Sequence, residues 1–239
     1  MKISILTMFP EMLDSLKNSP IIQHAQRDGI LELEIVDIKE FADGSFRHID
    51  DSPYGGGPGM VLRCEPVLKA LHSVETEGAH VVIPLPIGAT YTEEKAHAYT
   101  KLEHLILIAG HYEGLDARVL RYADEFISLG DYVISGGEYA CMILVDSVVR
   151  LLDGVIKKKS TEDESFENGL LEYPQYTRPV EYEGMKVPDV LLSGNHEKIA
   201  EWKKKKALEL TYHCRKDLLD TYPLTEEERK YIAELKKEE

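Results

Sequence analysis

Cysteine is scarce in this chain, and long hydrophobic runs are missing. Cys64, Cys141 and Cys214 are far apart and odd in number, which argues against a disulfide framework or a zinc site and for reduced thiols. No apolar run approaches the ~20 residues that a membrane-spanning helix needs. The N-terminus also lacks the long apolar region and small-residue cleavage site of a signal peptide. We therefore expect a globular cytoplasmic protein with no membrane segment.

Several motifs of nucleotide-dependent enzymes are also missing. The sequence has no GxGxxG fingerprint, no GxxxxGK[ST] phosphate loop, no GxSxG elbow and no HExxH pair, which argues against Rossmann-type cofactor binding and classical nucleotide hydrolysis. The glycine-rich stretch Gly55–Gly59 has the wrong spacing for either phosphate motif. It is either a flexible surface loop or a loop that closes over a substrate.

Basic residues are fewer than acidic ones, and the imbalance is uneven. Residues 1–156 hold 12 Lys and Arg against 24 Asp and Glu, whereas residues 157–239 hold 16 against 19. The overall charge of −15 is a mild argument against nucleic acid. It is only mild because local basic patches decide where a phosphate backbone docks.

A strand–helix rhythm runs through the first two thirds of the chain. Short β-branched or apolar runs alternate with amphipathic stretches, which predicts an α/β fold with a mostly parallel sheet and flanking helices. The expected strands are Lys2–Thr7, Ile30–Ile38, Ala79–Leu85, Leu105–Ala109 and Phe126–Leu129. The expected helices include one opening at Phe9-Pro10-Glu11, then Pro66–Leu71, Glu93–Leu102 and Tyr139–Leu152.

The stretch His104–Gly154 organises the expected binding site. Three loops that follow predicted strands are rich in glycine or proline: Leu85–Gly88, Gly110–Gly114 and Leu129–Gly137. Glycine lets backbone N–H and C=O groups approach a ligand closely, and ligands of α/β proteins bind at the strand ends. These loops could hold an adenine and ribose.

The sequence changes character after the predicted sheet. Residues 157–169 are charged and poor in apolar side chains, so they are the best linker, and a small helical domain is expected from about residue 170.

Arg150 lies in an otherwise apolar run and must be paired or face a pocket. The Lys203–Lys206 run is either a solvated helix face or a phosphate contact. These residues support an α/β ligand-binding enzyme without naming its reaction.

Seven long motifs are spread over nearly the whole chain: ILTMFPEM, YGGGPGMV, GHYEGLDARV, SLGDYVISGGE, DSVVRLLDGV, SFENGLLEYPQYTRP and VPDVLLSGNHEKI. In sequence and in order they resemble the bacterial TrmD family of tRNA (guanine-N1)-methyltransferases, which act on guanine 37 beside the anticodon. The resemblance implies a SPOUT fold, in which the C-terminal part of a parallel α/β domain forms a deep trefoil knot. It also implies a homodimer whose active sites are each built from both subunits.

The resemblance also assigns binding residues. S-adenosylmethionine would be held by Pro86, Gly88, Gly110, Glu113, Leu129, Gly130, Asp131, Tyr132, Val133, Ile134, Gly136 and Gly137. Candidate tRNA contacts are Tyr173, Tyr176, Arg178, Ser193, His196 and the Lys203–Lys206 helix, with Lys203 and Lys204 foremost. The implied division is a methyltransferase domain over 1–156, a linker over 157–169 and a tRNA-binding domain over 170–239.

The implied chemistry needs a base and an electrostatic partner. Guanine N1 carries a proton, which a linker carboxylate can accept. We expect Glu164 to be this base, with Asp163 as the alternative. Arg150 would stabilise the negative charge that develops on O6. The family's activity is associated with magnesium, but no acidic cluster in the sequence identifies a metal site.

The chain departs from the family pattern at several positions. Glu164 stands where aspartate is usual, the third-strand loop reads LPIG instead of SPQG, and His111 replaces a common arginine. The linker also looks one residue shorter around Lys157–Lys159.

The alternatives to this function are another SPOUT enzyme, such as a ribose 2′-O-methyltransferase, and a non-catalytic RNA- or adenosine-binding module. A carboxylate linker and Arg150 within an apolar run favour catalysis.

Overall fold

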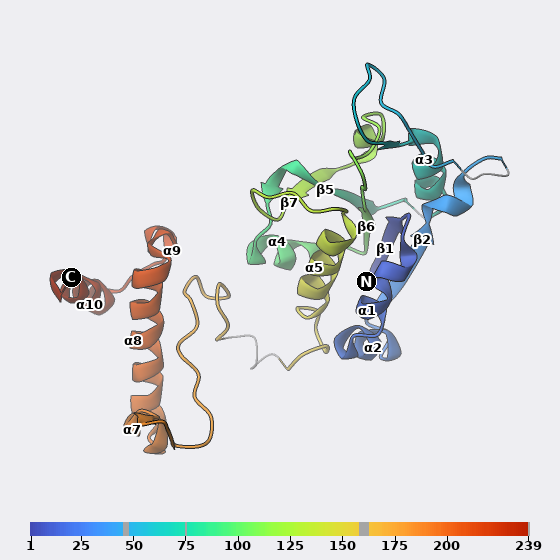
Figure 1. Ribbon diagram of the computed structural model, residues 1–239. Helices are drawn as coiled ribbons and strands as arrows, with labels where there is room; N and C mark the ends of the chain where they lie inside the picture. The colour runs from blue at the N-terminus through green and yellow to red at the C-terminus, as the bar shows by residue number, and fades with distance from the viewer. Residues whose placement is uncertain (45–47, 75, 158–162, 239) are drawn as a thin grey trace. The chain divides into compact units, whose positions relative to one another are not determined.

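The computed structural model describes residues 1–44, 48–74, 76–157 and 163–238 of the chain. The chain forms two compact units, Met1–Ile156 and Lys157–Glu239 (Figure 1). Each unit has a hydrophobic core of its own. In the part of the chain that the structure describes, no helix combines the length and apolar character needed to cross a membrane.

A five-stranded parallel sheet forms the centre of the N-terminal unit (Figure 1). The strand order is β2-β1-β6-β5-β7, and every neighbouring pair is parallel. The strands are β1 (Lys2–Thr7), β2 (Glu32–Asp37), β5 (Ala79–Thr90), β6 (His104–Ile108) and β7 (Glu125–Ser128). The predicted α/β fold with a parallel sheet is therefore confirmed.

Helices cover both faces of this sheet. Along β6, Leu105 and Leu107 pack into one core, while Ile106 and Ile108 pack into the other, because successive side chains of a strand point to opposite faces. The first core receives α1 (Asp14–Lys17), α2 (Pro20–Arg27), α4 (Glu93–Tyr99) and α5 (Glu138–Val149). The second receives α3 (Cys64–Ser73) and the 3-10 helices η2 (Ile38–Phe41) and η3 (Val119–Tyr122), whereas a third 3-10 helix, η1 (Pro10–Leu13), packs with α1.

Strand β5 is longer than the sequence predicts. It was expected to end at Leu85, yet it continues to Thr90. Pro84 and Ala89 both lie opposite Ile127 of β7, so the residues between them, Leu85–Gly88, leave the ladder and return to it. The prediction was wrong because proline and glycine interrupt the pairing only locally. Thr90 resumes it opposite Ser128.

A short hairpin flanks the glycine-rich stretch of the N-terminal unit. Strand β3 (Asp50–Asp51) pairs antiparallel with β4 (Val61–Leu62). These two-residue strands have too few residues to show a periodic pattern, so they were not predicted. They bring the two ends of the Tyr54–Gly59 loop together.

The C-terminal unit has its own small core around α8 (His196–Cys214). Leu170, Leu208 and Ile232 are among its buried residues. The remaining elements are β8 (Glu181–Tyr182), β9 (Met185–Lys186), α7 (Asp189–Leu192), α9 (Lys216–Thr221) and α10 (Glu226–Glu238). A capping box opens α10: Thr225 N–H donates to Glu228 (2.7 Å), and Glu228 N–H donates to Thr225 Oγ1 (3.2 Å).

Candidate functional site

A cavity of about 280 Å³ lies between the carboxyl ends of β6 and β7 and the excursion Leu85–Gly88 of β5, the strand between them. This volume is near the lower end of the range for small-molecule sites, roughly 300–1,000 Å³. The three loops predicted from their glycine and proline content meet here. The cavity is lined by Pro84, Leu85, Pro86, Gly110–Gly114, Ile127–Gly130, Tyr132–Gly137 and Ala140.

Most residues expected to bind the cofactor lie in this lining. They are Pro86, Gly110, Glu113, Leu129, Gly130, Tyr132, Val133, Ile134, Gly136 and Gly137. Gly88 and Asp131 are not among the lining residues. A Cβ atom on Gly88 would lie 2.3 Å from Ile127 N, so this glycine is required by close backbone packing against β7. Asp131 is exposed.

The sequence reasoning missed several lining residues, notably Tyr112, Ser128 and Ala140. Tyr112 lies in the predicted loop Gly110–Gly114, and Ser128 directly precedes the predicted loop Leu129–Gly137, so their positions were an available signal. Tyr112 also has φ of 57°, a strained conformation for a residue with a side chain that is often found in ligand-binding loops. Ala140 belongs to the first turn of α5 and gave no such signal.

Two of the pocket loops are fastened to each other through their backbones. Gly137 N–H donates to Gly110 C=O at 2.7 Å, and His111 forms an isolated antiparallel bridge with Gly136. A Cβ atom on Gly137 would lie 2.9 Å from Gly110 N. Only glycine permits this approach, so the pocket floor depends on it.

The pocket loop Gly110–Gly114 also adjoins the glycine-rich loop. Glu113 N–H donates to Met60 C=O at 3.0 Å, and Leu62 N–H donates to Gly114 C=O at 2.9 Å. A Cβ atom on Gly59 would lie 1.8 Å from Glu113 Oε1. The end of the glycine-rich loop therefore packs directly against the side chain of a pocket residue.

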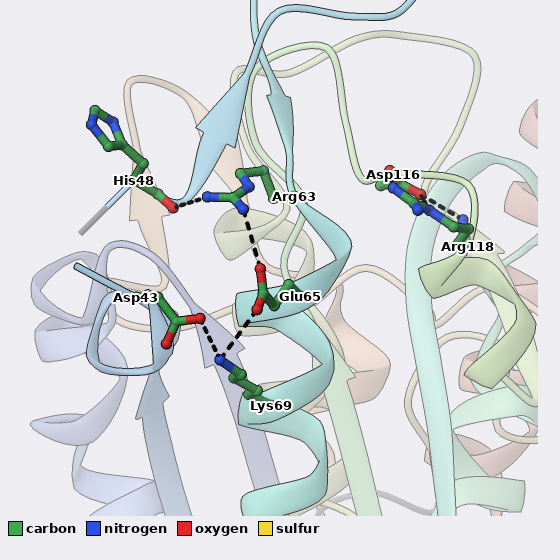
Figure 2. Close-up of polar contacts among 7 residues, drawn as sticks. All are labelled: Asp43, His48, Arg63, Glu65, Lys69, Asp116 and Arg118. Atoms are coloured by element: carbon green, nitrogen blue, oxygen red, sulfur yellow. Dashed lines mark hydrogen bonds and ion pairs between the residues drawn. The ribbon is translucent and has the colours of Figure 1, made fainter. Parts of the chain in front are cut away.

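Charged side chains fix the surroundings of this loop, as Figure 2 shows. Arg63, which follows β4, donates to His48 C=O at 3.1 Å and to Glu65 at 3.1 Å. Lys69 of α3 pairs with Asp43 at 2.7 Å and with Glu65 at 3.3 Å. By contrast, a Cβ atom on Gly55, Gly56 or Gly57 would meet nothing within 4 Å. The loop is anchored at its base and open at its tip.

A second ion pair follows the pocket loop 110–114. Arg118 donates to both carboxylate oxygens of Asp116, at 2.9 and 2.7 Å (Figure 2). This bidentate hydrogen bond lowers the pKa of Asp116 to about 2, so its carboxylate is ionised at neutral pH. Asp116 N–H donates in turn to Leu62 C=O at 2.9 Å. The pair thus holds the segment after the pocket loop, which is hydrogen-bonded to β4.

The charges around the cavity restrict the ligand. Among the described residues that line it, none is lysine or arginine, whereas Glu113 is acidic. A triphosphate or pyrophosphate would have no cationic side chain to pair with here. Glycine backbone, prolines and apolar side chains instead suit a flat heteroaromatic ring. The arrangement fits a ligand that is neutral or positively charged.

Arg150 lies at the far end of α5 from this cavity. The helix starts beside Gly137 and Ala140, which line the cavity, and Arg150 caps its other end, donating its N–H to Asp146 C=O at 3.1 Å. Twelve helical residues span about 18 Å at ~1.5 Å per residue. Within one N-terminal unit, the structure does not bring Arg150 to the pocket.

The predicted base lies in the C-terminal unit. Asp163 is exposed and lines a small cavity with Lys203 and Lys204, while Glu164 is half-buried. Residues 158–162 of the predicted linker lie outside the described residues. Within either unit alone, the described residues hold no group of three histidine, cysteine, aspartate or glutamate side chains placed to bind a metal.

The predicted phosphate contacts on α8 differ in their surroundings. Lys204, Lys205 and Lys206 form ion pairs with Glu228 (3.2 Å), Glu201 (2.9 Å) and Glu209 (2.6 Å), respectively. Lys203 instead lies over the ring of Tyr173, 4.3 Å from its centroid. Neighbouring carboxylates thus offset three of the four charges. The other predicted contacts, Tyr176, Arg178, Ser193 and His196, are exposed.

A parallel α/β unit with a backbone-built pocket beside three of its strands defines an α/β enzyme that binds a small molecule. The profile of the family described as tRNA (Guanine-1)-methyltransferase TrmD matches residues 1–221. Proteins named tRNA (guanine-N(1)-)-methyltransferase are similar over the full chain. The one from Geobacillus kaustophilus is 49% identical over 242 residues, covering 100% of this chain and 99% of its own, and that from Bacillus subtilis is 46% identical over 244 residues, covering 100% of both. The chain belongs to the TrmD family.

Proposed function

We propose that this protein methylates N1 of guanine 37 in tRNA, next to the anticodon, with S-adenosylmethionine as the methyl donor. Membership of a methyltransferase family supports the reaction class. We choose this donor because of the pocket lining. The lining is rich in glycine, and among its described residues it contains no lysine or arginine. The ligand has a flat adenine and a positively charged sulfonium, and both suit these walls.

The pocket residues divide the work of holding the donor. Backbone groups at Gly110 and in the loop Leu129–Ile134 form hydrogen bonds with the edge of the adenine. They can approach it closely because these positions are glycine or accessible loop backbone. Pro86 and Leu85 supply an apolar wall, and the Glu113 carboxylate supplies negative charge. When bound, S-adenosylmethionine would supply an electrophilic methyl group, whose bond to sulfur would break as the bond to N1 forms, leaving the donor as a neutral thioether.

Glu164 and Arg150 act on the guanine. The Glu164 carboxylate accepts the N1 proton, so the lone pair on N1 becomes available for the new bond to carbon. The Arg150 guanidinium stabilises the charge that develops on O6. Guanine 37 must leave the base stack to reach them, as the targets of base-modifying enzymes do.

The active site is shared between two copies of the chain. Arg150 lies ten residues, or about 15 Å along the axis of α5, beyond Ala140, which lines the cavity of its own subunit, so it serves the pocket of a partner. Apolar side chains beside the cavity and on α5 are exposed and suit the face that the second copy covers. They are Tyr132, Val133, Ile134, Tyr139 and Ile143, and Val133 is 90% exposed.

The loops around the pocket form a trefoil knot. Membership of the TrmD family supports this, and the backbone contacts of Gly88 with β7 and of Gly137 with Gly110 hold the loops close together. Residues 1–156 are the methyltransferase domain, 157–169 the linker that carries the base, and 170–239 the domain that binds tRNA. Tyr176, Arg178, Ser193, His196 and Lys203 are its contacts, and Lys204 joins them only if tRNA displaces Glu228.

The test uses the purified protein, methyl-labelled S-adenosylmethionine and two tRNA transcripts. One transcript carries guanine at positions 36 and 37, and the other carries adenine at position 37. Label at N1 of guanine 37 in the first transcript alone is the expected result. Label on a ribose 2′-oxygen would indicate a different SPOUT methyltransferase, and donor binding without any transfer would indicate a non-catalytic module.

A further inference from the structure

A fully buried carboxylate lies directly behind the pocket. Glu138 is the first residue of α5, and its side chain is 0% exposed. Burying a charge costs free energy unless hydrogen bonds and opposite charge compensate for it. An acidic residue in the first turn of a helix stabilises the helix even when it is exposed to solvent, so this role alone does not explain the burial of Glu138. The carboxylate therefore has a specific structural task.

The partners of Glu138 come from two other parts of the sheet edge. Thr7 Oγ1, at the carboxyl end of β1, donates to Glu138 Oε1 at 2.8 Å, and His111 Nδ1, in the loop after β6, lies 3.4 Å from Oε2. Thr7 Oγ1 also accepts from Phe9 N–H at 2.9 Å. The carboxylate thus joins three segments that are far apart in the sequence.

His111 connects the Glu138 carboxylate to residues that line the cavity. Its ring meets the rings of Phe9 (4.7 Å between centroids) and Tyr112 (4.9 Å) edge to face. His111 and Tyr112 both line the cavity. A Cβ atom on Gly136, also in the lining, would lie 2.3 Å from both Glu138 Oε2 and His111 Nδ1. The carboxylate, the imidazole and the second pocket loop are therefore in mutual contact.

We propose that Glu138 is a positioning residue for the methyl-donor pocket, acting through Thr7 and His111 to hold the loops 110–114 and 130–137 in their binding arrangement. It does not face the cavity itself, because it is absent from the described lining. The part of this proposal that concerns the methyl donor rests on the proposed function. The part that concerns the loops does not.

The test starts from Thr7→Val, which keeps the shape of the side chain but removes the hydroxyl, and from Glu138→Gln. The matched control is Ser4→Ala, in the same strand. Ser4 is also 0% exposed and bonds to Glu34 (2.8 Å) and His104 (2.9 Å), none of which line the pocket. Thr7→Ser restores the hydroxyl and should restore every property that Thr7→Val loses.

Two readouts separate positioning from general stability. In the ligand-free protein, amide hydrogen exchange of residues 110–114 and 130–137 should rise at least ~10-fold in Thr7→Val and Glu138→Gln, and remain unchanged in Ser4→Ala. Calorimetric titration should show a matching rise in the Kd for S-adenosylmethionine. Unchanged exchange in these two loops, or an equal rise in Ser4→Ala, overturns the proposal.

The same experiment distinguishes the two hypotheses. If the wild-type protein binds no S-adenosylmethionine, the proposed function fails, yet loop exchange still decides the role of Glu138. If the wild type binds the donor and the variants bind it equally well, the proposed function stands and the positioning role fails.

Discussion

Gly59 and Glu113 are in direct contact: a Cβ atom on the glycine would lie 1.8 Å from a carboxylate oxygen of the glutamate. The two residues belong to different loops, and Glu113 lines the cavity. The position of the end of the glycine-rich loop therefore restricts the conformation of the Glu113 side chain. The contact links a loop that could cover the substrate to the donor pocket.

We expect Gly59→Ala to weaken donor binding by at least ~10-fold, because the new methyl group displaces the Glu113 carboxylate. Gly59 has φ of +85°, so alanine also costs roughly 1 kcal/mol in backbone strain. Gly56→Ala is the matched control, with φ of +77° and no atom within 4 Å of its Cβ position. Calorimetric titration with S-adenosylmethionine compares the two variants. Equal affinities would show that the contact does not matter for binding.

Glu164→Gln should lower turnover by roughly 10²-fold or more, the range expected for loss of a general base. Binding of the methyl donor should be unchanged, since the proposed role of Glu164 is to accept a proton from the guanine and not to hold the donor. Single-turnover methylation of the guanine-37 transcript measures the effect. A large loss in Asp163→Asn combined with normal turnover in Glu164→Gln would move the base by one residue.

Two inactive variants should restore activity when combined if the active site is shared. Arg150→Ala keeps the pocket, and Glu113→Ala keeps the arginine. Unfolding and refolding an equal mixture of the two should return about a quarter of the wild-type activity, because half of the dimers are mixed and each mixed dimer has one intact site. No recovery, with dimers demonstrably exchanged, would place both residues in the same subunit's site.

Lys203→Gln should weaken tRNA binding and reduce its salt dependence by about one unit of slope on a double-logarithmic plot, as expected for the loss of one phosphate contact. Lys203 packs over Tyr173, so its charge is not offset by the ion pairs that hold its neighbours. Lys205→Gln is the control because Lys205 pairs with Glu201 one helical turn away. Binding measured over a range of salt concentrations should separate the two variants.

The sequence revealed those features that arise from local pattern. Strand β1 has its predicted bounds, and the pocket segments within β5 and after β6 and β7 were found because glycine and proline are local signals. The contact of Thr7 with Glu138 spans 131 positions. From the sequence, Glu138 is an ordinary acidic residue in a first helical turn, and its sequence neighbours do not predict that it is buried.

The position of Arg150 shows the same limit. An arginine in an apolar run indicates a special environment, but the pattern does not say which pocket the side chain serves. Only the length of α5 separates it from the pocket of its own subunit. The continuation of β5 was missed for a related reason, because the partner that renews its pairing, Ile127, lies far along the chain.

The excursion of β5 separates the shape of the pocket from the integrity of the sheet. Because Pro84 and Ala89 both face Ile127, residues 85–87 can change in composition without shifting the register of the strands on either side, whereas Gly88 must stay because a Cβ atom there would lie 2.3 Å from Ile127 N. A different ligand specificity could therefore evolve, or be engineered, in these three positions while the parallel sheet stays as it is.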